Sequence, residues 1–211
     1  QKKTKDWLVQ APILASYGTG APYINGGDIK NTGVELGFTW NDQIKKDFTY
    51  GASLNIAYNK NEVTRLANGE GVINGSVDAL STQTDYITRV EVGRPIGFFY
   101  GYKTLGIFQN AEQVNNYKNA KGSRIMPNAV PGDVIFADLN GDGTISADDR
   151  TMIGDPHPDL NVGLNFNLGY KGFDLSISGV GAFGQQVAHS YRDFGDNPKD
   201  NFTMDIAANR W

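Results

Sequence analysis

Residues 48–59, FTYGASLNIAYN, alternate between apolar and small or polar side chains at every step. One set is Phe48, Tyr50, Ala52, Leu54, Ile56 and Tyr58, and the other is Thr49, Gly51, Ser53, Asn55, Ala57 and Asn59. A two-residue period places each set on one face of a β-strand. The same alternation occurs in residues 34–40, 160–170 and 173–178. Because short connections join neighbouring segments, the sequence predicts an all-β protein built from antiparallel strands.

The polar faces of these strands carry almost no charge. They consist mainly of Gly, Ser, Asn and Thr, and Glu35 and Asp174 are the charged exceptions. Aromatic residues gather at one end of the apolar faces, next to the connections 41–47 and 171–172. Aromatic girdles, strands of about ten residues and a small polar inner face are typical of outer-membrane barrels. The alternative is a soluble sheet that packs its apolar face against a core.

The composition excludes several classes of function. The chain has 211 residues, with 23 Asp and Glu against 19 Lys and Arg, and it contains no Cys. A net charge of −4 without a basic stripe argues against nucleic-acid binding. The lack of Cys excludes disulfide scaffolds, thiolate zinc sites and cysteine nucleophiles. Because neither a nucleophile elbow nor a phosphate loop occurs, we predict no enzyme and no catalytic residue.

The lengths of the connections predict the side of the membrane on which each lies. Periplasmic turns of such barrels are short, whereas their extracellular loops are long. Residues 1–63 are therefore expected to contain barrel strands joined by the periplasmic turn 41–47. Residues 160–182 are expected to form a barrel hairpin with its turn at 171–172.

The two longer connections are expected to be extracellular. They are the segment 64–159 and the loop 183–211. Within the first, residues 86–92 and 98–108 on either side of the turn 93–95 form a possible further strand pair. Because the chain does not begin with Met and has no leader segment, we expect it to be an internal piece of a longer protein.

Residues 138–149, DLNGDGTISADD, match the twelve-residue calcium-binding loop, with Gly143 at the position of its sharp turn. The expected ligands of a structural Ca²⁺ are the side chains of Asp138, Asn140 and Asp142, the carbonyl of Thr144, and Ser146 and Asp149. The last ligand is Asp where Glu is usual, so its bidentate reach is shorter. We therefore expect a weak site of the extracellular class.

A cation-free turn is the alternative for this loop. Asp and Asn side chains accept hydrogen bonds from nearby backbone N–H groups, and Ser146 is placed to cap a short helix at 147–150. Against this alternative, the four carboxylates of the loop repel one another unless a cation neutralises them. If the sheet is soluble, the whole chain becomes a calcium-stabilised β-rich module that binds carbohydrate, with exposed aromatic residues as the sugar contacts.

Several motifs resemble those of the SusC/RagA family of TonB-linked outer-membrane proteins, and they keep the order of that family. They cover most of residues 31–184 and comprise Asn31-Thr32-Gly33-Val34-Glu35, the stretch GRPIGFFYGY at 93–102, Gly106-Ile107-Phe108, Pro131-Gly132-Asp133 before the acidic loop, Arg150, Ile153-Gly154-Asp155-Pro156 and residues 164–176.

The resemblance implies a fold and a function for the complete protein. Members of this family have a 22-stranded transmembrane β-barrel with long extracellular loops and an N-terminal plug, in the outer membrane. They import glycan or peptide fragments with energy relayed by the TonB complex, and a SusD-like surface lipoprotein captures the ligand. The present chain resembles part of the C-terminal half of that barrel, in contact with outer-membrane lipid.

Overall fold

The computed structural model describes residues 1–10, 23–77, 85–188 and 204. These residues form two compact units. The first contains residues 1–75, 89–98 and 154–187, and the second contains residues 76–88 and 99–153 together with the C-terminal segment. Among the described residues, no helix has the length and apolarity that crossing a membrane requires.

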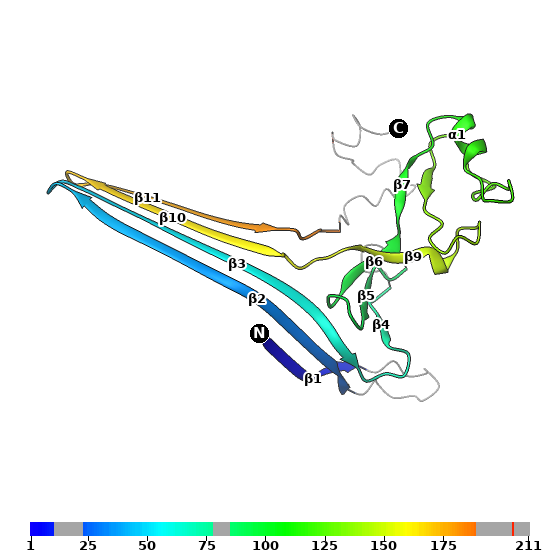
Figure 1. The fold of residues 1–211 in the computed structure, drawn as a ribbon, viewed down its shortest axis with the longest axis horizontal. Helices are drawn as coiled ribbons and strands as arrows, with labels where there is room; N and C mark the ends of the chain where they lie inside the picture. The colour runs from blue at the N-terminus through cyan, green and yellow to red at the C-terminus, as the bar shows by residue number, and fades with distance from the viewer. Residues whose placement is uncertain (11–22, 78–84, 189–203, 205–211) are drawn as a thin grey trace. The chain divides into compact units, whose positions relative to one another are not determined.

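The first unit is dominated by a single antiparallel sheet (Figure 1). Its strand order is β1-β2-β3-β10-β11. The five strands are β1 (Lys2–Gln10), β2 (Tyr23–Ile44), β3 (Phe48–Leu66), β10 (Leu160–Tyr170) and β11 (Phe173–Phe183). All four segments with a two-residue period lie within these strands, which confirms the prediction of an antiparallel all-β fold.

The turn expected at 41–47 is tighter than the sequence indicated, whereas the turn at 171–172 lies where it was predicted. β2 and β3 remain paired from Asn41 opposite Gly51 to Ile44 opposite Phe48, so only residues 45–47 form the turn. The end of β2 was hard to predict because its last residues are polar, and polar and charged residues are common both in turns and at the ends of strands. Lys171 and Gly172, both with positive φ, form a two-residue turn between β10 and β11.

The register places apolar residues opposite one another across three strands. Leu36 pairs with Ile56, and Ile56 pairs with Val162. The next row on the same face contains Phe38, Leu54 and Leu164. Because neighbouring strands keep the same phase, each face of the sheet has one chemical character across β2, β3 and β10.

The first unit also contains a small hairpin that contacts β3. β4 (Val72–Asn74) pairs with β5 (Thr88–Glu91). In the turn after β5, the carbonyl of Arg94 accepts a hydrogen bond from the N–H of Val63, and the N–H of Gly93 donates to the carbonyl of Val63. The turn therefore continues the pairing of β3 beyond the end of β10.

The second unit has a small core of its own. It contains most of β6 (Phe98–Tyr102) and β9 (Arg150–Gly154), which pair with each other, and the two-stranded sheet of β7 (Thr104–Ile107) and β8 (Val134–Phe136). The helix α1 (Ala111–Asn116) begins after Asn110, whose side chain accepts a hydrogen bond from the N–H of Gln113. The buried cluster comprises Phe108, Val114 and Ala129, with Tyr117, Met126 and Ile135 packed against it.

Candidate functional site

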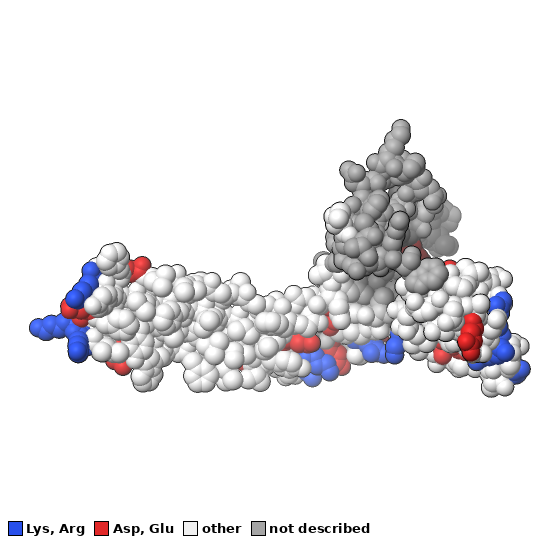
Figure 2. Space-filling view, turned by 90° about the horizontal axis from the view of Figure 1, so that it is seen from above, with Lys and Arg blue, Asp and Glu red and all other residues white. Residues whose placement is uncertain are grey.

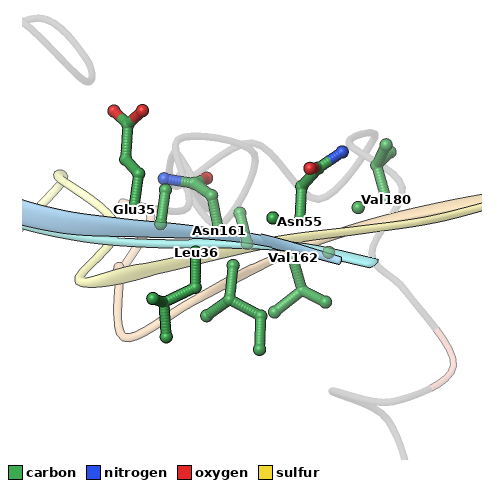
Figure 3. Close-up of a pocket in the computed structure, with 12 residues that line it drawn as sticks. Glu35, Leu36, Asn55, Asn161, Val162 and Val180 are labelled. Atoms are coloured by element: carbon green, nitrogen blue, oxygen red, sulfur yellow. The ribbon is translucent and has the colours of Figure 1, made fainter. Parts of the chain in front are cut away.

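The sheet of the first unit presents two chemically different faces. Figure 3 shows Glu35, Asn55 and Asn161 projecting from one face and Leu36 and Val162 from the other. The polar side chains on the first face interact with one another across strands. The amide of Asn165 donates to the hydroxyl oxygen of Ser53, and the hydroxyl of Ser176 donates to the amide oxygen of Asn167, at 3.3 and 2.7 Å.

The apolar face is exposed along its length. Phe38 is 63% exposed, Leu164 48% and Phe173 80%, and no second layer covers this face within the described part of the chain. Figure 2 shows that charged side chains gather at the turn end of the sheet and that the adjoining band is almost free of charge. An apolar face of this extent is unfavourable in water and suits hydrocarbon.

Aromatic residues mark the turn end of the apolar face. Phe48 on β3 pairs with Tyr170 on β10, and their ring centroids are 6.2 Å apart in an edge-to-face arrangement. The ammonium of Lys171 lies 5.4 Å above the ring of Tyr170. The hydroxyl of Tyr50 donates to the carboxylate of Asp42 at 3.2 Å. Aromatic rings whose polar edge contacts water, next to charged residues, are typical of a membrane interface.

The acidic loop of the second unit is closed by its own side chains. The two carboxylate oxygens of Asp138 accept from the N–H groups of Gly141 and Gly143, at 2.7 and 2.8 Å. One carboxylate oxygen of Asp142 accepts from both the N–H and the hydroxyl of Thr144. These hydrogen bonds lower the pKa of Asp142, those from Thr144 first and the one from the amide of Asn140 after them.

Asp149 is the buried member of the loop. Its side chain is fully buried, and its carboxylate accepts from the N–H groups of Ser146, Leu139 and Asn140 at 2.8, 2.8 and 3.4 Å. The hydrogen bond from Ser146 is the main cause that lowers the pKa of Asp149. Ser146 caps the 3-10 helix η2 (Ala147–Asp149), as the sequence predicted.

The donor set of the loop fits calcium in chemical type. The structure brings all six predicted ligands into one turn, and carboxylate, amide, hydroxyl and carbonyl oxygens are the ligands that Ca²⁺ prefers. Within the residues that the structure describes, however, no three His, Cys, Asp or Glu side chains are grouped as a metal site. The assignment of Asp138, Asn140, Asp142, Thr144, Ser146 and Asp149 to calcium therefore stays a prediction.

Arg150 follows the acidic loop and makes contacts that sequence reasoning missed. Its guanidinium donates to the carboxylate of Asp85 at 2.6 Å and lies 5.8 Å from the ring of Tyr86 and 5.1 Å from the ring of Tyr102. The hydrogen bond to Asp85 raises the pKa of Arg150 and lowers that of Asp85. The Arg150 cluster thus joins the start of β9 to β6 and to the segment before β5.

The chain is similar to receptors of the bacterial outer membrane. It is 32% identical over 187 residues to the TonB-dependent receptor P3 of Formosa agariphila, which covers 88% of this chain and 18% of the receptor. It is 28% identical over 214 residues to the TonB-dependent receptor SusC of Bacteroides thetaiotaomicron, which covers 99% of this chain and 19% of SusC. No family profile matches the sequence.

Comparison of the fold with solved structures also finds a transporter of this kind. The structure of the RagAB peptide transporter aligns with a TM-score of 0.62 and 25% identity over 86% of this chain and 18% of that one. The chain is part of a SusC/RagA-like TonB-dependent receptor. It spans 18–21% of the length of the curated relatives it matches.

Membership of the SusC/RagA family confirms three predictions. The antiparallel strands correspond to strands of the receptor β-barrel. The protein belongs to the outer membrane, which is the location of receptors such as SusC and RagA. TonB-dependent receptors are not enzymes, in agreement with the prediction of no enzyme.

Proposed function

We propose that this chain forms part of the barrel wall of a TonB-dependent transporter that imports glycan or peptide fragments together with a SusD-like surface lipoprotein. The observation that carries the proposal is the single-layer sheet, whose apolar face is exposed from Val34 to Trp40 on β2 and from Phe173 to Ile177 on β11. A wall of this kind separates hydrocarbon from an inner polar surface. The similarity to RagAB, a peptide transporter, supports the transport function, and the similarity to SusC supports dependence on TonB.

The topology of the transporter follows from strand lengths. β10 and β11 each have 11 residues, enough for the 9–11 or so that a tilted membrane strand needs. β5 and β6 have four and five residues, too few to cross, so the pair around the turn 93–95 lies outside the membrane. The turns 45–47 and 171–172 would then face the periplasm, and the second unit would be extracellular.

The exposed apolar face disfavours a soluble carbohydrate-binding module. A soluble module would bury Phe38, Leu164 and Phe173 against a second layer, whereas an exposed apolar sheet in water would associate with other chains. The transporter therefore explains more of the structure than the soluble alternative does.

Spin labels on the full-length receptor in lipid vesicles test the barrel proposal. Labels at Leu54 and Leu164 should be accessible to oxygen in the hydrocarbon and shielded from a water-soluble nickel reagent. Labels at the neighbouring Ser53 and Asn165 serve as matched controls, because they point to the opposite face. If the labels at Leu54 and Leu164 are water-accessible or packed inside protein, the barrel proposal is wrong.

We also propose that the acidic loop 138–149 binds one structural Ca²⁺ in the complete receptor. The oxygen donors of the loop and its excess of carboxylates support this role. Limited proteolysis of the full receptor should then show cleavage within 138–149 when EGTA removes calcium, and protection when millimolar calcium is restored. Asp138→Asn should abolish this difference, whereas Asp148→Asn, outside the ligand set, should preserve it. Equal protection with and without calcium would exclude the site.

A further inference from the structure

The second unit contains a groove between β7 and α1. Its volume is about 590 Å³, within the range of ligand pockets of roughly 300–1,000 Å³. Residues 105–109 line one side, and Glu112, Gln113 and Asn116 of α1 line the other. All of the lining residues belong to the second unit.

The β7 side of the groove consists of consecutive residues. Neighbouring side chains of a strand point to opposite faces, so a groove lined by an unbroken run is bordered by the backbone edge itself. β7 has β8 as its single neighbour in the described two-stranded sheet, so its outer edge has no strand partner there. On this edge the side-chain amide of Gln109 donates to the carbonyl of Ile107 at 3.0 Å, in the place of a strand partner. Gly106 lies at a bulge in this strand with φ +139, and a Cβ there would meet open space. The backbone can therefore be approached closely.

The side chains of the groove divide into an apolar and a polar part. Leu105 is 57% exposed and Ile107 is 38% exposed on the β7 side. On the α1 side, the amide oxygen of Gln113 accepts from the N–H of Gln109 at 2.8 Å, which fixes the polar wall. Glu112 is the only charged residue among those that line the groove.

These features suit an extended peptide better than a sugar ring. An added strand that displaces the side-chain amide of Gln109 gains backbone hydrogen bonds from this edge and places alternate side chains in apolar contacts. A sugar ring commonly stacks its apolar face on an exposed aromatic ring. The aromatic residues of the groove lack one, because Phe108 is 1% exposed and the half-buried Tyr117 uses its hydroxyl to donate to the carbonyl of Phe136.

We propose that the groove between β7 and α1 binds transported peptides in extended conformation along β7, with a basic side chain of the peptide paired to Glu112. The proposal rests on the import function proposed above and narrows it to peptides. An apolar side chain of the peptide contacts Leu105 and Ile107, and the open space at Gly106 lets the peptide backbone approach.

Binding to the full-length receptor in detergent tests the groove. The probe is a fluorescent hexapeptide of alternating valine and threonine with one lysine, and its anisotropy reports the Kd. Glu112→Lys should weaken binding about tenfold, and a peptide with glutamate in place of lysine should regain that affinity. Glu70→Lys, another exposed acidic residue that lies in the first unit, is the matched control and should change nothing. The regained affinity also shows that Glu112→Lys is folded.

Two further probes test the strand geometry. Leu105→Gln should weaken binding several-fold, whereas Val130→Gln, an equally exposed valine outside the groove, should not. A hexapeptide N-methylated at alternate residues cannot pair with β7 and should lose most of its affinity.

Three results would each overturn the proposal. They are equal affinity of the methylated and unmethylated peptides, equal effects of Glu112→Lys and Glu70→Lys, and displacement of the probe by maltohexaose. Loss of binding when the partner lipoprotein is added would assign the groove to a subunit contact and overturn it as well.

Uptake by cells separates failure of the groove from failure of the import function. If deletion of the receptor gene leaves the uptake of both peptides and oligosaccharides unchanged, the import function is wrong. If uptake depends on the receptor but is normal in Glu112→Lys and Leu105→Gln, only the peptide groove is wrong.

Discussion

The sheet of the first unit and the core of the second unit are stabilised in different ways. The sheet is one layer thick, and its strands are held by a continuous ladder of backbone pairs from Asn31–Asn61 to Ile44–Phe48. The second unit is held by side chains. Phe108 and Val114 are buried there, and the hydroxyl of Tyr117 donates to the carbonyl of Phe136 at 2.6 Å.

This difference shows where the stability of each region comes from. A single sheet with two exposed faces has no core, so lipid and further strands must supply the missing contacts. The second unit buries apolar side chains in its own core, so it depends less on contacts with lipid or with other strands. Substitutions should therefore act locally in the second unit and on membrane assembly in the sheet.

The largest effect is expected from Phe108→Ala. Removing a fully buried aromatic side chain should destabilise the second unit by about 3–5 kcal/mol. Hydrogen exchange of residues 104–136 in the full receptor should accelerate, while the heat-resistant migration of the barrel in gels should stay unchanged. Leu105→Ala, which truncates an exposed neighbour, is the control. If the barrel loses its heat resistance instead, the two regions are not independent.

A charge on the apolar face should have the next largest effect. Leu164→Arg places a cation against hydrocarbon and should destabilise the folded barrel by about 2–4 kcal/mol. Asn165→Arg, one residue along on the opposite face, should cost far less. Urea unfolding of the receptor in lipid vesicles measures both. Equal destabilisation by the two substitutions would mean that the two faces do not differ in environment.

Acid should loosen the second unit in a defined pH range. The hydrogen bonds to Asp149, first that from Ser146, hold its pKa below the ordinary value of about 3.9. The stabilisation by this carboxylate is therefore complete above about pH 4 and is lost as the pH falls through the lowered pKa. Hydrogen exchange of residues 138–149, corrected for the intrinsic effect of pH, should rise between pH 4 and pH 2. Asp149→Asn should show the fast exchange at every pH.

The sheet could be predicted from sequence because its signal is local. Alternation over residues 48–59 or 160–170 specifies both the strand and its two faces, and neighbouring strands repeat it. The ends of the strands were harder to place. Asn41 and Asp42 have turn-like chemistry, yet their backbone groups continue the ladder opposite Gly51 and Tyr50.

The second unit could be predicted only in part. The acidic loop has a fixed spacing, so its turn and the cap by Ser146 were visible in the sequence. The contacts of Arg150 and the groove beside β7 were not visible. Asp85 and Arg150 are far apart in the chain, as are Leu105 and Ile135, and no periodic pattern links residues that meet only through tertiary packing.

The smallest effect is expected from Arg150→Lys, which keeps the charge but removes the planar guanidinium. Lysine can still pair with Asp85, but it loses the stacking on Tyr86 and Tyr102, so the second unit should lose about 1 kcal/mol. Hydrogen exchange of residues 85–88 and 150–153 measures this loss. Tyr102→Leu removes one ring, and in that background Arg150→Lys should cost less than in the native protein. If Arg150→Lys costs the same stability in both backgrounds, Arg150 acts through its ion pair with Asp85 alone. The packing of its guanidinium on the aromatic rings would then contribute less to the second unit than the contacts indicate.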